Sequence, residues 1–350
     1  MAEILRFVDP NSSAGGDGTT NALTGAARAY VSLNAWEAAT QQDLTDGGGD
    51  TARVVCSSDD AGSTHLADTT AVTIDGWTTD ATRYIQIEAA SSHGGKWNDS
   101  IYRLIIANSA GLNCIERYTR VYGLQVNVTA VDALYQWGIN VAPDGIVAKC
   151  IVKGMGSSTA YAYHNGIHIN ADTYTFYVYD NIIYDWKSSD VNGGIGVHFT
   201  AFTSTCYFYN NTIYNCTRGM LWVYGSITAI NNIIRLCDPA ASGTFAAGTD
   251  YNATDNASMN YTVTGSGNTH DRLSQTFTFV NEGADDFHLA SNDAGARDYG
   301  VTDPGSGLFS DDIDGQTRTG TWDIGADEYV AAGGSPYESY ITITKNWALE

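Results

Sequence analysis

The middle of the chain contains two interleaved repeats that share nearly one period. The first is a glycine that opens an apolar–x–apolar run, and its successive spacings are 27, 28, 28 and 25 residues: Gly111, Gly138, Gly166, Gly194 and Gly219. The second is a residue that opens another apolar run and recurs at spacings of 27, 31, 30 and 21 residues: Gly123, Cys150, Asn181, Asn211 and Asn232. No helical periodicity of useful length occurs between Ala52 and Arg235. A unit of this size made of short strands and turns is one coil of a parallel β-solenoid.

Stacking of such coils predicts which positions meet. We expect one interior column from the glycine series, formed by Ile139, Ile167, Ile195 and Met220, and further interior columns from the pair Ile182/Ile233 and the set Ile183/Ile213/Ile234. Asn181, Asn211 and Asn232 are expected at a sharp corner, where asparagine tolerates left-handed backbone and its amide can bond the next coil. The tyrosines that recur at a spacing of 30 form either an aromatic core or an exposed stripe: Tyr177/Tyr207, Tyr179/Tyr209 and Tyr184/Tyr214.

The GΦxΦ and NNxΦ repeats, where Φ is apolar, resemble the pectate-lyase-like superfamily over about Arg53 to Leu236. That resemblance implies an all-β fold, a single-stranded right-handed parallel β-helix. It says little about function, because many activities share this fold. The ending Asp312-Ile-Asp-Gly-Gln-Thr-Arg318 … Asp323-Ile-Gly-Ala-Asp-Glu-Tyr329 and the opening stretch are similar to bacterial and phage-associated β-helix proteins of undefined activity.

Three regions follow along the chain. Residues 1–51 form an N-terminal segment with a short capping helix at Ser32–Gln42, for which Ser32 is the N-cap. Residues 52–330 form the β-helix, whose last coils diverge, and residues 331–350 form a linker and a terminal strand at Tyr340–Thr344. That strand's partner is this chain or another, so a homo-oligomer formed through the C-terminal segment is one expectation.

Charge and cysteine usage narrow the partners. The 17 Lys+Arg against 39 Asp+Glu give a net charge of −22, which excludes nucleic acid as an expected partner and disfavours anionic membranes. No run of 18 apolar residues is present, so no membrane span is expected. No signal peptide is visible either, as in a protein that leaves its cell as part of a virion, so we expect an extracellular or virion-borne protein. The six cysteines contain no CxxC pair, which argues against a cysteine zinc site and favours buried, reduced thiols. Cys216 and Cys237 each follow a corner asparagine by five residues, so we expect them on adjacent coils.

The candidate chemistry lies on the outward side of the glycine-series strands. With Gly166 and Gly194 in register, His168 and His198 are diagonal neighbours with Cα atoms roughly 8 Å apart. His168 and His198 are the candidate general acid or base near neutral pH, and Arg218 would stabilise an anion. The alternative is an ordinary solvated sheet. The surrounding residues are candidate contacts to a sugar: Asn140, Asn170, Tyr163 and His164.

Aromatic residues at the coil junctions point to glycans, since flat rings offer sugars an apolar platform with a polar edge. Trp137 and Trp222 are the candidates for substrate binding, accompanied by Tyr135, Tyr161 and Trp186. Stacked aromatics are also ordinary solenoid core, and that interpretation stays open.

No cofactor is expected, with calcium at Asp312 and Asp314 as the single candidate. An Asp-x-Asp-Gly run supplies oxygen ligands and a turn, but it lacks the further ligands of an EF-hand loop. An aspartate-rich turn that caps backbone amides is the favoured alternative.

Three functions agree with these features. The first is a virion-borne or secreted β-helix protein that binds a cell-surface or environmental polysaccharide and in some cases cleaves it. The second is an active polysaccharide lyase or glycoside hydrolase, although neither the lysine pattern of such lyases nor the paired aspartates of such hydrolases can be matched residue by residue. The third is a purely structural appendage or scaffold protein.

Overall fold

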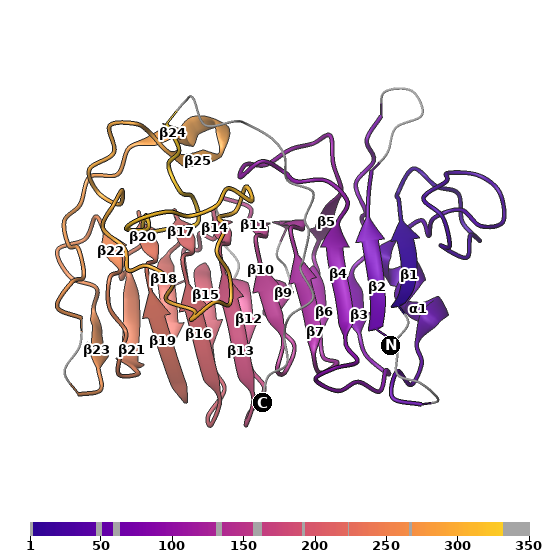
Figure 1. Ribbon diagram of the computed structural model, residues 1–350, viewed down its shortest axis with the longest axis horizontal. Helices are drawn as coiled ribbons and strands as arrows, with labels where there is room; N and C mark the ends of the chain where they lie inside the picture. The colour runs from indigo at the N-terminus through magenta and orange to yellow at the C-terminus, as the bar shows by residue number, and fades with distance from the viewer. Residues whose placement is uncertain are drawn as a thin grey trace.

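The computed structural model describes residues 3–46, 51–58, 64–130, 135–156, 163–190, 193–222, 224–265 and 268–331. The predicted strand Tyr340–Thr344 and Tyr161 lie outside the described residues. The chain winds into coils whose strands stack as three parallel sheets (Figure 1). This confirms the predicted parallel β-helix.

Each sheet takes one strand from most of the coils. The first sheet contains β1 (Glu3–Val8), β2 (Thr51–Cys56), β4 (Ile85–Ala89), β7 (Thr119–Tyr122), β10 (Ile146–Ala148), β13 (Thr175–Tyr179), β16 (Thr205–Tyr209) and β19 (Ser226–Ile230). The second contains β5 (Arg103–Ala107), β8 (Gln125–Ala130), β11 (Ile151–Lys153), β14 (Ile182–Tyr184), β17 (Thr212–Tyr214), β20 (Ile233–Arg235) and β22 (Ala253–Thr254). The third contains β3 (Val72–Ile74), β6 (Leu112–Cys114), β9 (Tyr135–Asn140), β12 (Tyr163–Ile169), β15 (Ile195–Phe199), β18 (Arg218–Trp222), β21 (Ala241–Phe245) and β23 (Tyr261–Val263).

The N-terminal segment is joined to the first sheet. β1 pairs in parallel with β2, so this sheet begins well before the boundary predicted at residue 52. The helix α1 (Leu33–Thr40) lies within the predicted range, and the Ser32 hydroxyl accepts the N–H of Ala35 at 3.0 Å. Leu33 and Trp36 belong to the main core. The role of this helix as a cap stays a prediction.

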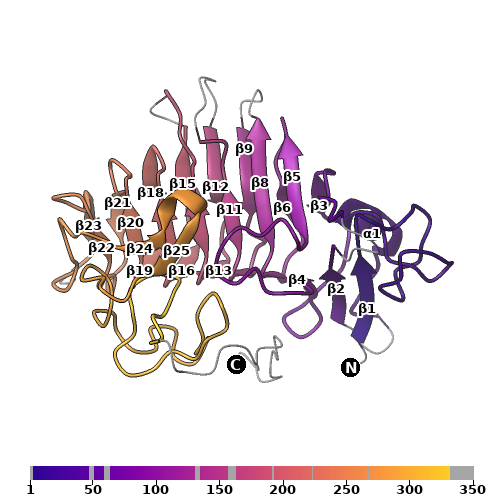
Figure 2. The ribbon, with the colours of Figure 1, turned by 90° about the horizontal axis from the view of Figure 1, so that it is seen from above.

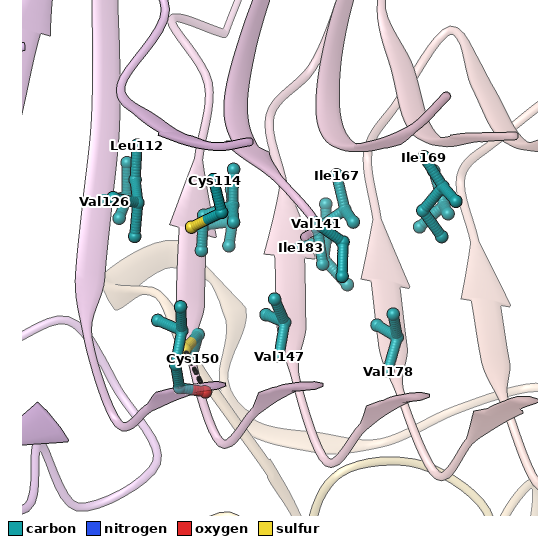
Figure 3. Packing of buried hydrophobic residues seen from close by; sticks show 14 of the residues in the cluster. Leu112, Cys114, Val126, Val141, Val147, Cys150, Ile167, Ile169, Val178 and Ile183 are labelled. Atoms are coloured by element: carbon teal, nitrogen blue, oxygen red, sulfur yellow. Dashed lines mark hydrogen bonds between the residues drawn. The ribbon is translucent and has the colours of Figure 1, made fainter. Parts of the chain in front are cut away.

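The interior column of the third sheet differs from the predicted one at a single coil. Ile139, Ile167 and Met220 are in register with Val197, and not with Ile195. The physical reason is a glycine column. A Cβ at Gly196 would lie 2.6 Å from the Ile213 side chain and 2.7 Å from the Gly219 carbonyl oxygen, so this position must be glycine. Gly194 serves instead in a turn, with φ +69°. Figure 3 shows the interior side chains, including Ile167, Ile169 and Ile183.

The asparagine ladder between the first and second sheets is confirmed and is one coil longer than predicted. The Asn211 side-chain oxygen accepts the backbone N–H of Asn181, and Asn232 and Asn252 repeat this bond for the next two coils. All four asparagines are completely buried. The left-handed backbone lies one residue earlier than expected, for example at Asn210 with φ 49°.

Residues 277–331, here called the C-terminal segment, fold back over the outside of the β-helix (Figures 1 and 2). They include the antiparallel pair β24 (Phe279–Asn281) and β25 (Asp286–Leu289), joined by the 3₁₀ helix η1 (Glu282–Ala284). Ile182 and Ile233 pack against this segment, so the prediction that they are interior was wrong. Their outward face is apolar because it is covered.

The tyrosine columns are also outside the barrel and partly covered. Tyr179 stacks on Phe309 at 4.7 Å between ring centroids, and Tyr209 packs with Phe309 and Trp322 in the same cluster. Tyr177 and Tyr207 stack on each other at 5.3 Å and are only partly buried. Neither of the two predicted alternatives, a core or an exposed stripe, describes these columns fully.

The six cysteines are free and buried. The backbone N–H of Cys216 lies 3.4 Å from the Cys237 sulfur, which confirms that these residues occupy neighbouring coils. No helix in the described part of the chain is long and apolar enough to cross a membrane.

Candidate functional site

The two candidate histidines lie directly opposite each other on the third sheet. His168 of β12 pairs with His198 of β15, and Asn140 of β9 pairs with His168. The His168 and His198 ring centroids are 5.5 Å apart. The predicted diagonal arrangement was therefore wrong, because Gly196 rather than Gly194 continues the glycine column. In the observed register, the two imidazoles lie closer together than the sequence suggested.

A second outward column runs beside the first. Trp137, Asn165, Ile195 and Arg218 are in register on β9, β12, β15 and β18. The Trp137 indole stacks on His168 with centroids 5.2 Å apart and planes 26° from parallel. Ile195 is fully buried yet belongs to none of the core clusters, as expected for a sheltered residue on the outer face. The outward residues of the two columns are called the histidine face: Trp137, Asn140, Asn165, His168, His198 and Arg218.

Several polar atoms of the histidine face are buried and have no hydrogen-bond partner in the described part of the chain. They are Trp137 Nε1, Asn140 Oδ1, Asn165 Oδ1, His168 Nδ1 and His198 Nδ1. Such atoms are uncommon in native proteins, and each costs about 1–3 kcal/mol unless a partner is supplied. The partly buried Arg218 guanidinium has no carboxylate or carbonyl acceptor among the described residues. The histidine face therefore offers unsatisfied donors and acceptors, and the buried ones among them are out of contact with solvent.

Burial also sets the protonation of the histidines. Burial, reinforced by the charge of His198, lowers the pKa of His168 to about 3. Burial and the Arg218 charge lower the pKa of His198 to about 4. Both imidazoles are then neutral at pH 7, where they can donate one hydrogen bond and accept another. This corrects the expectation of an acid or base that titrates near neutral pH.

The remaining predicted contacts lie at the two ends of β12 or in the interior. Tyr163 begins β12 and pairs with Tyr135, whose side chain is 63% exposed, and Asn170 lies exposed just beyond the end of β12. His164 points away from the face, because its ring is buried near Trp186 in the main core.

Trp222 and Trp186 are core residues. Trp222 is 7% exposed and stacks on Phe199 at 4.5 Å between centroids, and Trp186 is 1% exposed. The platform prediction therefore applies to Trp137 alone among the described tryptophans that we singled out.

Asp312 caps backbone amides, as expected of an aspartate-rich turn, and calcium binding at Asp312 and Asp314 stays a prediction. The two Asp312 carboxylate oxygens accept the backbone N–H groups of Asp314 at 3.0 Å, Gln316 at 2.8 Å and Glu328 at 3.0 Å. Asp314 instead contacts His288, whose Nε2 lies 2.8 Å from Asp314 Oδ2. His288 and its neighbour Asp327 were missed, because no sequence spacing connects β25 to the aspartate-rich turn.

Comparisons with known proteins leave the family open. No family model matches the chain, and no curated protein matches it. Among solved structures, the crystal structure of pectate lyase Pel9A matches over 94% of this chain and 97% of that one, with 11% sequence identity and a TM-score of 0.34. A likeness at that level carries no information about the site. The parallel β-helix is established by the strand ladders themselves.

Proposed function

We propose that this protein binds a polysaccharide on the histidine face. The observation that supports the proposal most is the group of buried, unpartnered polar atoms beside a stacked indole. Sugar hydroxyls both donate and accept hydrogen bonds, so they can satisfy the Asn140 oxygen and the two imidazoles together. The indole supplies the flat apolar surface that a sugar ring covers.

The shape of the site favours a chain-like ligand. Strands β9, β12, β15 and β18 are neighbours in one sheet, with about 4.8 Å between successive strands. Their outward side chains form a row along the axis of the β-helix, and a polymer can lie along such a row. The net charge of −22 argues for a neutral polymer or one that carries few anionic groups.

Binding without cleavage is the simpler form of this proposal. Histidines with pKa values near 3 and 4 are neutral at pH 7, so neither carries the extra imidazolium proton that a general acid would transfer. Cleavage of the polysaccharide, by a lyase or hydrolase reaction, is the alternative. The proposal also places the protein on a virion or outside the cell. This part rests on the similarity of the opening stretch and of the Asp312–Tyr329 ending to phage-associated β-helix proteins.

A glycan array with the purified protein tests the proposal. We expect binding to one class of polysaccharide, and we expect His198→Gln and Trp137→Ala each to weaken it about tenfold, which corresponds to about 1.4 kcal/mol. His270→Gln is the matched control, because His270 is exposed on a distant coil and pairs only with local groups. Circular dichroism confirms that each variant is folded.

The same preparations decide between the alternatives. Assays for reducing ends and for unsaturated products should show no turnover. Products that disappear in the His198 variant would favour the enzyme. Binding that both site variants retain would place any glycan elsewhere, and no binding to any glycan would favour the structural role.

A further inference from the structure

A histidine and several carboxylates converge in the C-terminal segment, far from the histidine face. His288 of β25, Asp314 and Asp327 place one ligand atom each within 4.8 Å of one another. We call these three residues the His288 cluster. Neither the predicted calcium pair nor the proposed glycan site includes His288 or Asp327.

The orientation of His288 is that of a metal-binding histidine. Its Nδ1 lies 2.5 Å from Asp286 Oδ1, and its Nε2 faces Asp314. Metal-bound histidines usually donate their second ring N–H to a carboxylate, which fixes the ring and makes it a better ligand. Asp286 supplies this support and is itself held by Lys96 at 3.3 Å.

The carboxylates of the cluster have unused oxygen capacity. Asp327 is 5% exposed, and among the described residues its carboxylate accepts one hydrogen bond, from the Leu289 N–H at 2.7 Å. Asp314 Oδ2 accepts from His288 and from the Gln316 amide at 3.2 Å. Asp314 Oδ1 is buried and meets no donor from the residues that the structure describes. Buried carboxylate oxygens are expensive unless a donor or a cation meets them.

The loop that contains Gly95 packs tightly against His288 and Asp314. A Cβ at Gly95 would lie 2.4 Å from Asp314 Oδ1 and 2.4 Å from His288 Nε2, so only glycine permits the approach of this loop. Carboxylates surround the one imidazole, because Asp286 and Asp314 contact its two ring nitrogens and Asp327 lies within reach of the same point.

We propose that His288, Asp314 and Asp327 bind a divalent transition-metal ion such as Zn²⁺. An imidazole nitrogen with two carboxylates suits zinc, whereas calcium takes six to eight oxygen ligands. Tetrahedral ligands at zinc lie roughly 3.4 Å apart, given bonds of about 2.0–2.1 Å, so small side-chain rotations bring the three atoms into range. The ion takes the place of the proton between His288 Nε2 and Asp314, and that proton leaves to solvent.

Zn²⁺ titration of the chelator-treated full chain tests this site. We expect one equivalent to bind and to raise the melting temperature. His288→Gln and Asp327→Asn should each weaken binding at least about tenfold, since even the loss of a supporting residue costs that much. His270→Gln is the matched control, because it removes a histidine–aspartate pair that is exposed, and it should bind zinc as the wild type does. Calcium and magnesium should bind far more weakly.

Several results would overturn the site. The first is that the wild type binds no zinc, and the second is that Asp327→Asn binds zinc as tightly as the wild type. The third is that His198→Gln loses zinc binding, which would place the ion at the His168–His198 pair instead. If both cluster variants fail to fold, X-ray absorption of the zinc-loaded wild type decides. One histidine nitrogen with oxygen ligands supports the site, and two histidines or any sulfur ligand refute it.

Discussion

Replacing His198 with glutamine removes a buried imidazole whose protonation the fold opposes. His198 is 8% exposed, its Nδ1 has no hydrogen-bond partner among the described residues, and the Arg218 charge acts on it. Burial and that charge lower its pKa to about 4, against a value near 6.5 in an unfolded chain. Glutamine keeps a polar side chain of similar reach but does not titrate in this range.

The sign and size of the effect follow from linkage. Between pH 6.5 and 4 the unfolded state binds the His198 proton and the folded state does not, so acid destabilises the fold in this window. The stability is fully present above pH 6.5 and is lost as the pH falls toward 4. From pH 7 to pH 5 the loss from this one group is about 2 kcal/mol.

Urea unfolding at pH 7 and at pH 5, followed by circular dichroism, measures this term. Other groups also titrate, so the decisive quantity is the difference between wild type and variant. We expect the wild type to lose about 2 kcal/mol more than His198→Gln on acidification. A difference smaller than about 0.5 kcal/mol would show that the imidazole is solvated, and our description of the histidine face as sheltered would be wrong.

Two further variants test the packing around the β-helix, and urea unfolding measures both. Asn211→Ala should lower the free energy of unfolding by about 3–6 kcal/mol, because the buried Asn181 N–H and two buried carbonyls lose their hydrogen-bond partner. Asn170→Ala is the control at an exposed asparagine and should change stability by less than about 0.5 kcal/mol. Equal small effects would refute the ladder. Arg318→Met should cost about 3–5 kcal/mol by leaving buried Asp180 unpaired, and adding Asp180→Asn should recover much of it. A double variant no more stable than the single one would contradict this pairing.

The fold could be predicted well from the sequence, because successive coils carry the same kind of residue at equivalent positions. The corner asparagines and the neighbouring cysteines kept their predicted partners. The prediction failed at Ile195, because Gly194 and Gly196 both fit the repeat pattern and only the packing against Gly219 and Ile213 selects the second. It also failed at Ile182, since a column of apolar residues on an outer face looks interior until the segment that covers it is known.

The candidate site was predicted in its residues but not in its chemistry. His168, His198 and Asn140 do lie together, because their strands pair in register. Arg218 lies in the neighbouring column, in register with Ile195. The protonation of the two histidines depends on burial of the outer face, which the repeat pattern does not predict. Trp222 was misplaced because an aromatic residue near a strand end suits a core and a surface platform equally well in sequence.

Nuclear magnetic resonance of the histidine side chains, during titration with the polysaccharide selected on the array, tests the histidine face most directly. We expect the imidazole signals of His168 and His198 to report neutral rings at pH 7 and to shift on addition of the glycan, while His270 stays unchanged. Unchanged His168 and His198 signals at a glycan concentration that saturates binding would contradict the assignment of this face as the binding site.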